Sequence, residues 1–361
     1  MRTHRAAILV IDSFSGAIMG CLGTQVEPIR AVDRSSKVRS WAIIIVTNLV
    51  SLICLSWALN GAGLEHIWGE AREMDWRWVS FAVVSDVLIY LFHALRWQLL
   101  LKPVKKVPFS HCAEAIYVGM FANETIPLRA GELIRCFLLS KSSGLPLSVS
   151  FASALIERIL DGIWLMLAFF VCLQMQTLPG VLVKGGYILG ILIVLLGLIL
   201  AYAMYAKQQS LTLFFGMSWP KWLNTLIEDL HVIGHSRYLY FSFIVSGVYM
   251  FSQLIPIYAI VRASDLDVPW MASFLILVLL RLSGVVPQAP SNLGSFQWVT
   301  AKTLMMYGLV SAHAKRFSLI LWAALTLPII ITGFVALAIE GVNLSHLHKE
   351  AAASARSRRD A

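Results

Sequence analysis

The sequence predicts an all-α membrane protein that crosses the bilayer about six to eight times. Composition is the first observation behind this prediction. Hydrophobic residues make up 58% of the chain and charged residues 14%, against roughly 25% charged residues in an average soluble domain. The mean hydropathy is +0.74. A water-soluble surface cannot accommodate this balance, so we expect lipid to cover much of the protein.

Long uncharged runs are the second observation. Crossing a hydrocarbon core of about 30 Å takes about 20 apolar helical residues. Four runs without Asp, Glu, Lys or Arg have this length: 41–59, 187–205, 238–261 and 317–339. Two further spans, 78–101 and 147–175, contain a few charges. The run lengths favour helices, because the strands of a membrane barrel are shorter and alternate in polarity.

The distribution of lysine and arginine predicts the orientation. Basic residues gather before the first span, after the second span and in the C-terminal tail. Cytoplasmic segments are enriched in Lys and Arg, so we expect both termini in the cytoplasm of a bacterial-type inner membrane. This topology requires that residues 111–146 and 270–310 each enter and leave the membrane on the same side, as re-entrant hairpins do.

Proline and glycine interrupt both of these regions. The first contains PLRAG, from Pro127 to Gly131, and the second contains Pro287 followed by PSNLG, from Pro290 to Gly294. Non-helical backbone at membrane depth is tolerated where it is packed in protein or lines a watery cavity. Paired interruptions in two halves of a chain are typical of inverted-repeat transporters. The alternative is two ordinary loops between complete spans.

The second interruption contains no charged side chain in VVPQAPSNLGSF. We expect Ser291 or Asn292 to cap the half-helix that follows it.

The first interruption carries the densest group of polar side chains at membrane depth: Asn123, Glu124, Arg129, Glu132 and Arg135. If the helix resumes near residue 128, Arg129, Glu132 and Arg135 share one face, and Glu132 can pair with either arginine. Arginine binds phosphate through two parallel hydrogen bonds, so this face is a candidate site for a lipid headgroup. The alternative is a buried ion-pair network that only locks the hairpin.

The next span carries Glu157, Arg158 and Asp161, and we predict a salt bridge between Arg158 and Asp161. Ionisable side chains within a membrane usually face a protein interior or a cavity, so these three either line the headgroup site or tie two helices together. Arg281, just before the second interruption, is expected to add positive charge. Asp86 and Arg96 are weaker candidates, because Arg96 stands beside Trp97 and can extend toward the interface.

We expect no metal and no cofactor. The five cysteines form no CxxC pair and the nine histidines form no HExxH motif. Nucleic-acid binding is not predicted, because the net charge of +9 is accounted for by loops and tail. We expect residues 1–40 to be a poorly ordered cytoplasmic extension, 41–341 the membrane domain and 342–361 a disordered basic tail.

Three segments, in this order, resemble the flippase-like family of the transmembrane region of lysylphosphatidylglycerol synthases. They are FANETIPLRAGELIRCFLLS (121–140), ASALIERILDG (152–162) and VVPQAPSNLGSFQW (285–298). The resemblance implies a unit with broken helices that moves an amphipathic lipid between leaflets. The soluble aminoacyltransferase domain of the two-part synthases is not found in the sequence, so we do not expect this chain to synthesise lysylphosphatidylglycerol by itself.

Three functions follow as hypotheses. The first is translocation of a phospholipid or lipid-linked substrate with an anionic or phosphate-bearing headgroup. The second is an intramembrane lipid-modifying enzyme that uses Glu132, Glu157 or Asp161 as acid or base. The third is a non-transporting partner of a glycosyltransferase or another envelope-lipid enzyme.

Overall fold

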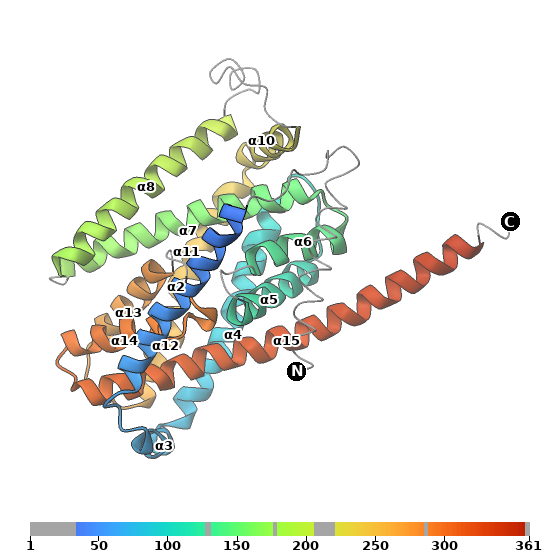
Figure 1. The fold of residues 1–361 in the computed structure, drawn as a ribbon. Helices are drawn as coiled ribbons and strands as arrows, with labels where there is room; N and C mark the ends of the chain where they lie inside the picture. The colour runs from blue at the N-terminus through green and yellow to red at the C-terminus, as the bar shows by residue number, and fades with distance from the viewer. Residues whose placement is uncertain (1–33, 127–130, 176–178, 206–220, 285–287, 358–361) are drawn as a thin grey trace. The chain divides into compact units, whose positions relative to one another are not determined.

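The computed structural model describes residues 34–126, 131–175, 179–205, 221–284 and 288–357, and every regular element within them is a helix (Figure 1). The predicted all-α class is confirmed. The chain divides into two compact parts, residues 1–46 and 47–361. In the first part, the described residues 34–46 form the beginning of helix α2 (Arg34–Leu59). The second part contains the rest of α2 and all the other described helices.

Within the described residues, four helical stretches are long and apolar enough to cross a membrane. They are Trp76–Leu101, Leu182–Ile199, Tyr238–Ala263 and Ser311–Ile339. Each overlaps a span predicted from the sequence. The predicted span 147–175 coincides with helix α7 (Leu147–Met175), which carries three charged residues in its interior. The protein is therefore a multi-pass membrane protein.

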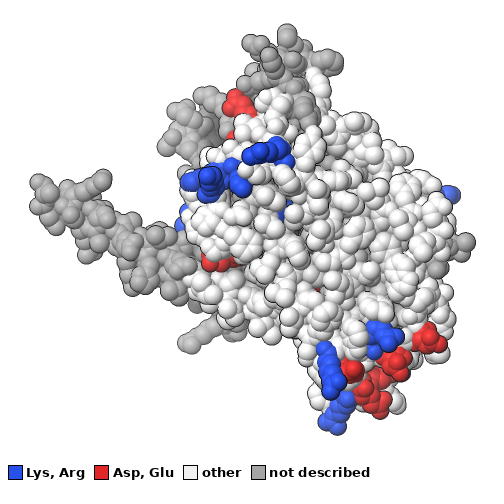
Figure 2. All heavy atoms as spheres, turned by 180° about the vertical axis from the view of Figure 1, so that it is seen from behind, with Lys and Arg blue, Asp and Glu red and all other residues white. Residues whose placement is uncertain are grey.

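Helix α4 (Trp76–Leu101) shows how the chain meets lipid and water. It begins at Asp75, whose side chain accepts a hydrogen bond from the Arg77 backbone N–H at 2.9 Å. The helix is about 39 Å long at 1.5 Å per residue, which exceeds the hydrocarbon thickness of about 30 Å. One side exposes a stripe of large apolar residues: Phe81, Val84, Leu88, Phe92 and Leu95. On the face drawn in Figure 2, charges gather in separate groups with a broad uncharged surface between them, as a lipid-facing belt requires.

The first predicted hairpin consists of α5 (Phe109–Thr125) and α6 (Gly131–Ser143). At 1.5 Å per residue these helices are about 25 Å and 20 Å long, so each is shorter than the hydrocarbon core. They pack closely because two glycines face each other: a Cβ on Gly131 would overlap the carbonyl oxygen of Gly119. The Asn123 Oδ1 accepts a hydrogen bond from the Gly131 N–H at 3.0 Å and joins the end of α5 to the start of α6. Pro127 and Arg129 lie outside the described residues.

The second hairpin consists of α13 (Trp270–Ser283), the short 3-10 turn η2 (Pro290–Asn292) and α14 (Ser295–Met306). Its tip meets the tip of the first hairpin. The Ser291 hydroxyl donates to the carbonyl oxygen of Glu124 at 2.8 Å, and the Trp322 indole donates to the carbonyl oxygen of Ser291 at 3.0 Å. The short helices on either side of each interruption confirm the predicted breaks. The inverted repeat itself stays a prediction. Pro287 lies outside the described residues.

The expected cap of the half-helix after the second break is wrong. Ser291 and Asn292 have φ values of 57° and 50°, in the left-handed region, whereas a capping residue usually has an extended backbone. The N-cap of α14 is Gly294, with φ 90°, and its N–H donates to the Gln297 Oε1 at 2.6 Å. A Cβ on Gly294 would overlap the carbonyl oxygen of Ser51, so the break needs glycine at this position.

Six further helices complete the described structure. They are α3 (Leu64–Glu73), α8 (Gly180–Tyr205), α10 (Lys221–Gly234), α11 (Tyr238–Ser252), α12 (Leu254–Ala263) and α15 (Ser311–Ser357). Pro256 lies just after the junction of α11 and α12, where it removes the N–H that would bond to the residue four positions earlier. Helix α15 includes residues 342–357, for which the sequence predicts disorder. The run AAASA within this stretch accounts for the helix, because alanine has the highest helix propensity.

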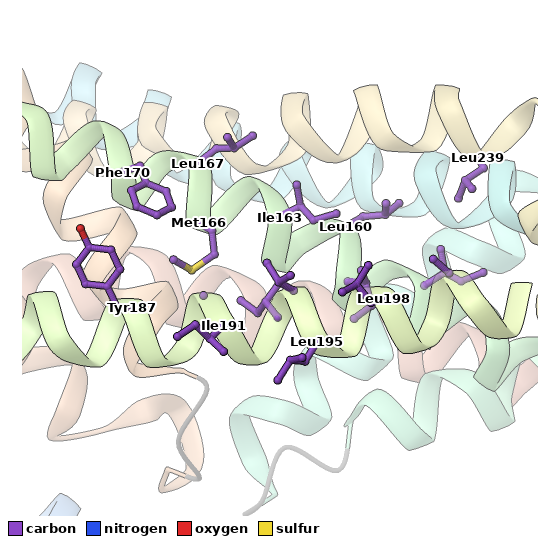
Figure 3. A pocket seen from close by; sticks show the side chains of 17 residues that line it. Leu160, Ile163, Met166, Leu167, Phe170, Tyr187, Ile191, Leu195, Leu198 and Leu239 are labelled. Carbon is purple, nitrogen blue, oxygen red and sulfur yellow. The ribbon is translucent and has the colours of Figure 1, made fainter. Parts of the chain in front are cut away.

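An apolar groove of about 690 Å³ separates α7 from α8 (Figure 3). On α7 it is lined by Ile156, Leu160, Ile163 and Leu167, which recur at the spacing of one helix face, and on α8 by Ile191, Leu195 and Leu198. Glu157 and Asp161 follow Ile156 and Leu160 by one position, so they point about 100° away around the helix. The groove therefore suits hydrocarbon and lies on a different face of α7 from the charges.

Candidate functional site

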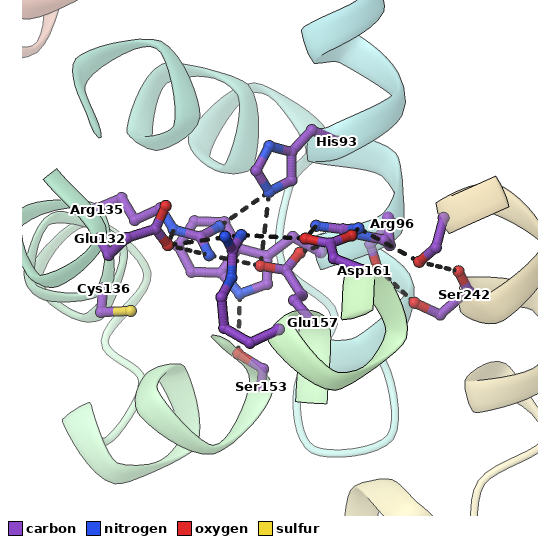
Figure 4. Close-up of polar contacts among 12 residues, drawn as sticks. His93, Arg96, Glu132, Arg135, Cys136, Ser153, Glu157, Asp161 and Ser242 are labelled. Atoms are coloured by element: carbon purple, nitrogen blue, oxygen red, sulfur yellow. Dashed lines mark hydrogen bonds and ion pairs between the residues drawn. The ribbon is translucent and has the colours of Figure 1, made fainter. Parts of the chain in front are cut away.

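A buried ion-pair network joins α4, α6 and α7, and α4 is one of the helices long and apolar enough to cross a membrane (Figure 4). Glu157 of α7 is at its centre, with no exposed side-chain surface. Its Oε2 accepts from the Arg135 Nη2 of α6 at 2.6 Å, and its Oε1 accepts from the Arg96 Nε of α4 at 3.2 Å. Two of the predicted residues, Arg135 and Glu157, are thus brought into direct contact.

The rim of this network is partly exposed. It consists of Glu132, Arg158 and Asp161, whose side chains are 32%, 47% and 28% exposed. The guanidinium of Arg158 lies 3.3 Å from the Asp161 carboxylate and 3.8 Å from that of Glu132. Both rim carboxylates also bind a buried arginine: Glu132 pairs with Arg135 at 2.8 Å, and Asp161 pairs with Arg96. The predicted pairs Glu132–Arg135 and Arg158–Asp161 are confirmed.

Arg96 is placed differently from the sequence prediction. Its side chain is fully buried and does not extend toward an interface. Besides Glu157 and Asp161, it contacts α11, where its Nη1 lies 3.3 Å from the Ser246 hydroxyl. The physical reason is that α7 offers two carboxylates at the depth of Arg96, and these partners stabilise the guanidinium more than partial hydration at the surface would.

Aromatic and histidine side chains enclose the buried arginines. The Arg135 guanidinium lies over the Trp97 ring at 4.6 Å, and the Trp97 indole donates to the Ser153 hydroxyl at 2.8 Å. The His93 Nε2 lies 3.3 Å from the Arg135 Nη1 and 3.6 Å from the Glu157 carboxylate. Sequence analysis missed His93. The available signal was its spacing: His93 precedes Arg96 by three positions and Trp97 by four, so the three share a face of α4.

The formal charges of the network cancel. Among the described residues, three arginines (Arg96, Arg135, Arg158) face three carboxylates (Glu132, Glu157, Asp161). A neutral network can be buried at lower cost than an isolated charge, and removal of one of its fully buried members leaves an uncompensated charge inside the protein.

Comparison with known proteins gives the family. A sequence model described as the transmembrane region of lysylphosphatidylglycerol synthase matches residues 42–333, well over half of the chain. The chain belongs to this family. The predicted resemblance is confirmed, and the three segments that carry it contain Asn123, Arg135, Glu157 and Gly294.

Two archaeal relatives of this family member match most of its length. A UPF0104 membrane protein of Methanothermobacter thermautotrophicus is 23% identical over 284 residues, which cover 70% of this chain and 82% of the relative. A second UPF0104 membrane protein of the same organism is 23% identical over 265 residues, covering 68% and 78%. These names describe membrane proteins and state no activity.

Two further residues predicted for the site, Asn123 and Arg281, lie outside the ion-pair network. Asn123 joins α5 to α6 and does not contact the charged groups of the network in any described interaction. Arg281 makes no ion pair with the described residues and lies over the Tyr249 ring at 5.8 Å. Arg96 lies over the same ring at 5.2 Å, so Arg281 and the network both contact Tyr249.

Proposed function

We propose that this protein binds the phosphate-bearing headgroup of a lipid at the rim formed by Glu132, Arg158 and Asp161, and moves that lipid between leaflets. One observation carries the proposal: a charged network at membrane depth is fully buried at one end and about half exposed at the other. A network that only held helices together would gain nothing from an exposed arginine at this depth, where ionisable groups are costly.

The geometry of Arg158 supports exchange with a ligand. Its contacts of 3.3 and 3.8 Å are longer than the 2.6 Å contact between Arg135 and Glu157. A phosphate that binds the guanidinium through two parallel hydrogen bonds would replace weak contacts with strong ones. The two rim carboxylates keep their buried arginine partners while this happens, so the network stays intact.

The interrupted helices support movement of the bound headgroup. The rim lies on α6 and α7, directly after the first break, and the second break meets the first through Ser291 and Glu124. Short helices that end at membrane depth can tilt with fewer broken backbone hydrogen bonds than a continuous span, and transporters place substrate sites at such breaks. The groove between α7 and α8 is an apolar surface for hydrocarbon and does not hold the headgroup in this proposal.

The proposal includes an orientation. Both termini are cytoplasmic in a bacterial-type inner membrane, which the Lys/Arg distribution of the sequence supports. The partner in this proposal is a membrane lipid with an anionic or phosphate-bearing headgroup.

The test is a leaflet-exchange assay with the purified full-length chain in phosphatidylglycerol liposomes containing a trace of fluorescent phosphatidylglycerol. Dithionite added outside quenches the outer leaflet, so the slow loss of the remaining fluorescence measures lipid movement. Arg158→Gln is expected to slow this movement about tenfold or more, since a charged hydrogen-bond pair is worth about 1.5–3 kcal/mol. Its stability is expected to change by less than about 0.5 kcal/mol, because exposed ion pairs contribute little.

The matched control is Arg77→Gln, an exposed arginine at the start of α4, outside the network. Equal exchange rates in Arg158→Gln, Arg77→Gln and the unmodified protein would refute the site. A chemically altered lipid, detected by mass spectrometry after incubation, would indicate a lipid-modifying enzyme. A stably co-purifying envelope enzyme without lipid exchange would indicate the non-transporting role.

A further inference from the structure

A second polar group lies near Tyr249, the ring that Arg96 of the network also contacts. Asp86 of α4 is 6% exposed, and its Oδ2 has no hydrogen-bond partner in the described structure. It makes no ion pair with any described residue, although the charges of Arg281 and Glu124 both act on it. A buried carboxylate that is close to an arginine but not in contact with it is unusual, because burial of an unpaired charge is strongly unfavourable.

Four helices bring ionisable side chains to this position. Asp86 and Tyr90 come from α4, Tyr117 and Glu124 from α5, Tyr249 from α11 and Arg281 from α13. The Tyr90 ring lies 6.2 Å from that of Tyr117 and 6.4 Å from that of Tyr249. Glu124 also provides the carbonyl oxygen that receives the Ser291 hydroxyl, so this group lies where the hairpin tips meet.

The other helices packed against α4 keep their charges elsewhere. Helix α7 contributes Asp161, which acts on Arg281 but belongs to the network. Helix α12 carries Arg262 near its end, where Ala263 bonds to Asp75 at the start of α4. In α15, Lys315 and Arg316 bind the segment between Asn60 and Glu70. Among the described residues, Asp86 and Arg281 are the oppositely charged groups of this second cluster, and the charge of Glu124 also acts on Asp86.

We propose that Asp86 is a proton-binding carboxyl that couples proton entry to movement of the second hairpin. Its use in transport rests on the proposed lipid movement. One proton adds to the Oδ2 of the carboxylate, no other bond breaks, and the Asp86 side chain becomes neutral. The neutral acid attracts Arg281 less than the carboxylate does, so α13 is less strongly held to α4.

The connection to the lipid site runs through Tyr249. Arg96 and Arg281 lie over the same ring at 5.2 and 5.8 Å, and His93 packs against it at 4.9 Å. A displacement of Arg281 changes the packing of that ring and thereby the surroundings of Arg96. Proton binding at Asp86 and headgroup binding at the rim are in this way linked through one side chain.

A proton fits this position better than a metal cation does. No group of three or more His, Cys, Asp or Glu suitable for a metal occurs in the part of the chain that the structure describes. A hard cation such as Ca²⁺ takes about six to eight oxygen ligands. The positive charge of Arg281 also disfavours a second cation beside Asp86, whereas protonation needs only the unpartnered oxygen.

The first test uses the unmodified protein and does not depend on transport. A hydrophobic carbodiimide reacts with protonated carboxyls, and peptide mapping by mass spectrometry locates the modified residue. We expect Asp86 to be labelled at acidic pH and protected at alkaline pH. The inference is overturned if Asp86 is not labelled at either pH, or if its labelling does not depend on pH.

The second test measures lipid exchange in proteoliposomes with an imposed proton gradient. The unmodified protein is expected to respond to the gradient, and Asp86→Asn to lose this response. Glu65→Gln, a carboxyl on the exposed part of α3, is the matched control and is expected to keep it. A response to a sodium gradient in place of the proton gradient, or an unchanged response in Asp86→Asn, would overturn the inference.

The two tests separate the failure of this inference from the failure of the proposed function. Labelling of Asp86 that depends on pH, together with an absence of lipid exchange, would keep the proton site and remove the transport role. Lipid exchange that is independent of pH, without labelling of Asp86, would keep the transport role and remove the proton site. If Asp86→Asn does not fold, the pH-dependent labelling of the unmodified protein decides whether Asp86 is a proton-binding site.

Discussion

Replacement of Glu157 by glutamine tests the buried network most directly. The substitution keeps the size of the side chain and removes its negative charge. Glu157 accepts hydrogen bonds from Arg135 at 2.6 Å and Arg96 at 3.2 Å, with no exposed surface. The amide retains one acceptor oxygen, so one of the two arginines loses its bond to residue 157 and keeps only its rim carboxylate, and the network gains a net charge of about +1. Breaking a buried ion pair on one side costs about 3–5 kcal/mol, and we expect Glu157→Gln to destabilise the protein by that amount.

The assay is equilibrium unfolding in mixed detergent micelles, followed by tryptophan fluorescence, because Trp97 packs directly on Arg135. A second variant, Arg135→Gln, and the double variant complete a double-mutant cycle. The double variant restores a neutral network, so its loss of stability is expected to be smaller than the sum of the single losses by about 1–3 kcal/mol. Losses that add to within about 0.5 kcal/mol would show that the two residues do not act as a pair.

Two further predictions concern close packing and the second break. Gly119→Ala places a Cβ 2.9 Å from the Cβ of Arg135, so it is expected to destabilise the α5–α6 pair by about 1–3 kcal/mol in the same unfolding assay. Gly69→Ala is the matched control: nothing lies within 4 Å of its new Cβ, and it should be neutral or slightly stabilising. Trp322→Phe removes the donor to the Ser291 carbonyl and is expected to cost about 1 kcal/mol and to speed hydrogen exchange around the second break. Unchanged exchange there would contradict a role for Trp322 in holding the break.

Local sequence patterns predicted the membrane spans well. Helix α7 begins and ends where the apolar run 147–175 does, because hydropathy and helix length are properties of a continuous segment. Ion pairs within one helix could also be predicted from the sequence. Glu132 and Arg135, and likewise Arg158 and Asp161, are three positions apart, and helical geometry fixes their separation without reference to the rest of the fold.

Contacts between helices could not be predicted from the sequence in this way. Arg96 and Glu157 are 61 positions apart, and Ser291 and Glu124 are 167 positions apart. From the sequence, the Arg96 side chain could equally well extend toward the membrane interface. In the structure it turns inward, because its partners Glu157 and Asp161 on α7 lie inside the protein. Ser291 has the side chain of a cap, but the left-handed backbone at the break directs it to the other hairpin.

Residue types and their order were enough to predict that this chain is a helical membrane protein, that Pro and Gly interrupt it twice, and that acidic and basic residues lie within its apolar segments. These features depend on residue type and on spacing along one helix. The packing of the helices revealed that Glu157 is the centre of the network, that Arg158 is its exposed end, and that the Oδ2 of buried Asp86 has no hydrogen-bond partner among the described residues. Each of these depends on which side chains neighbouring helices bring to the same depth, because a charge inside a membrane is stabilised by its partners in space and not by its neighbours in sequence.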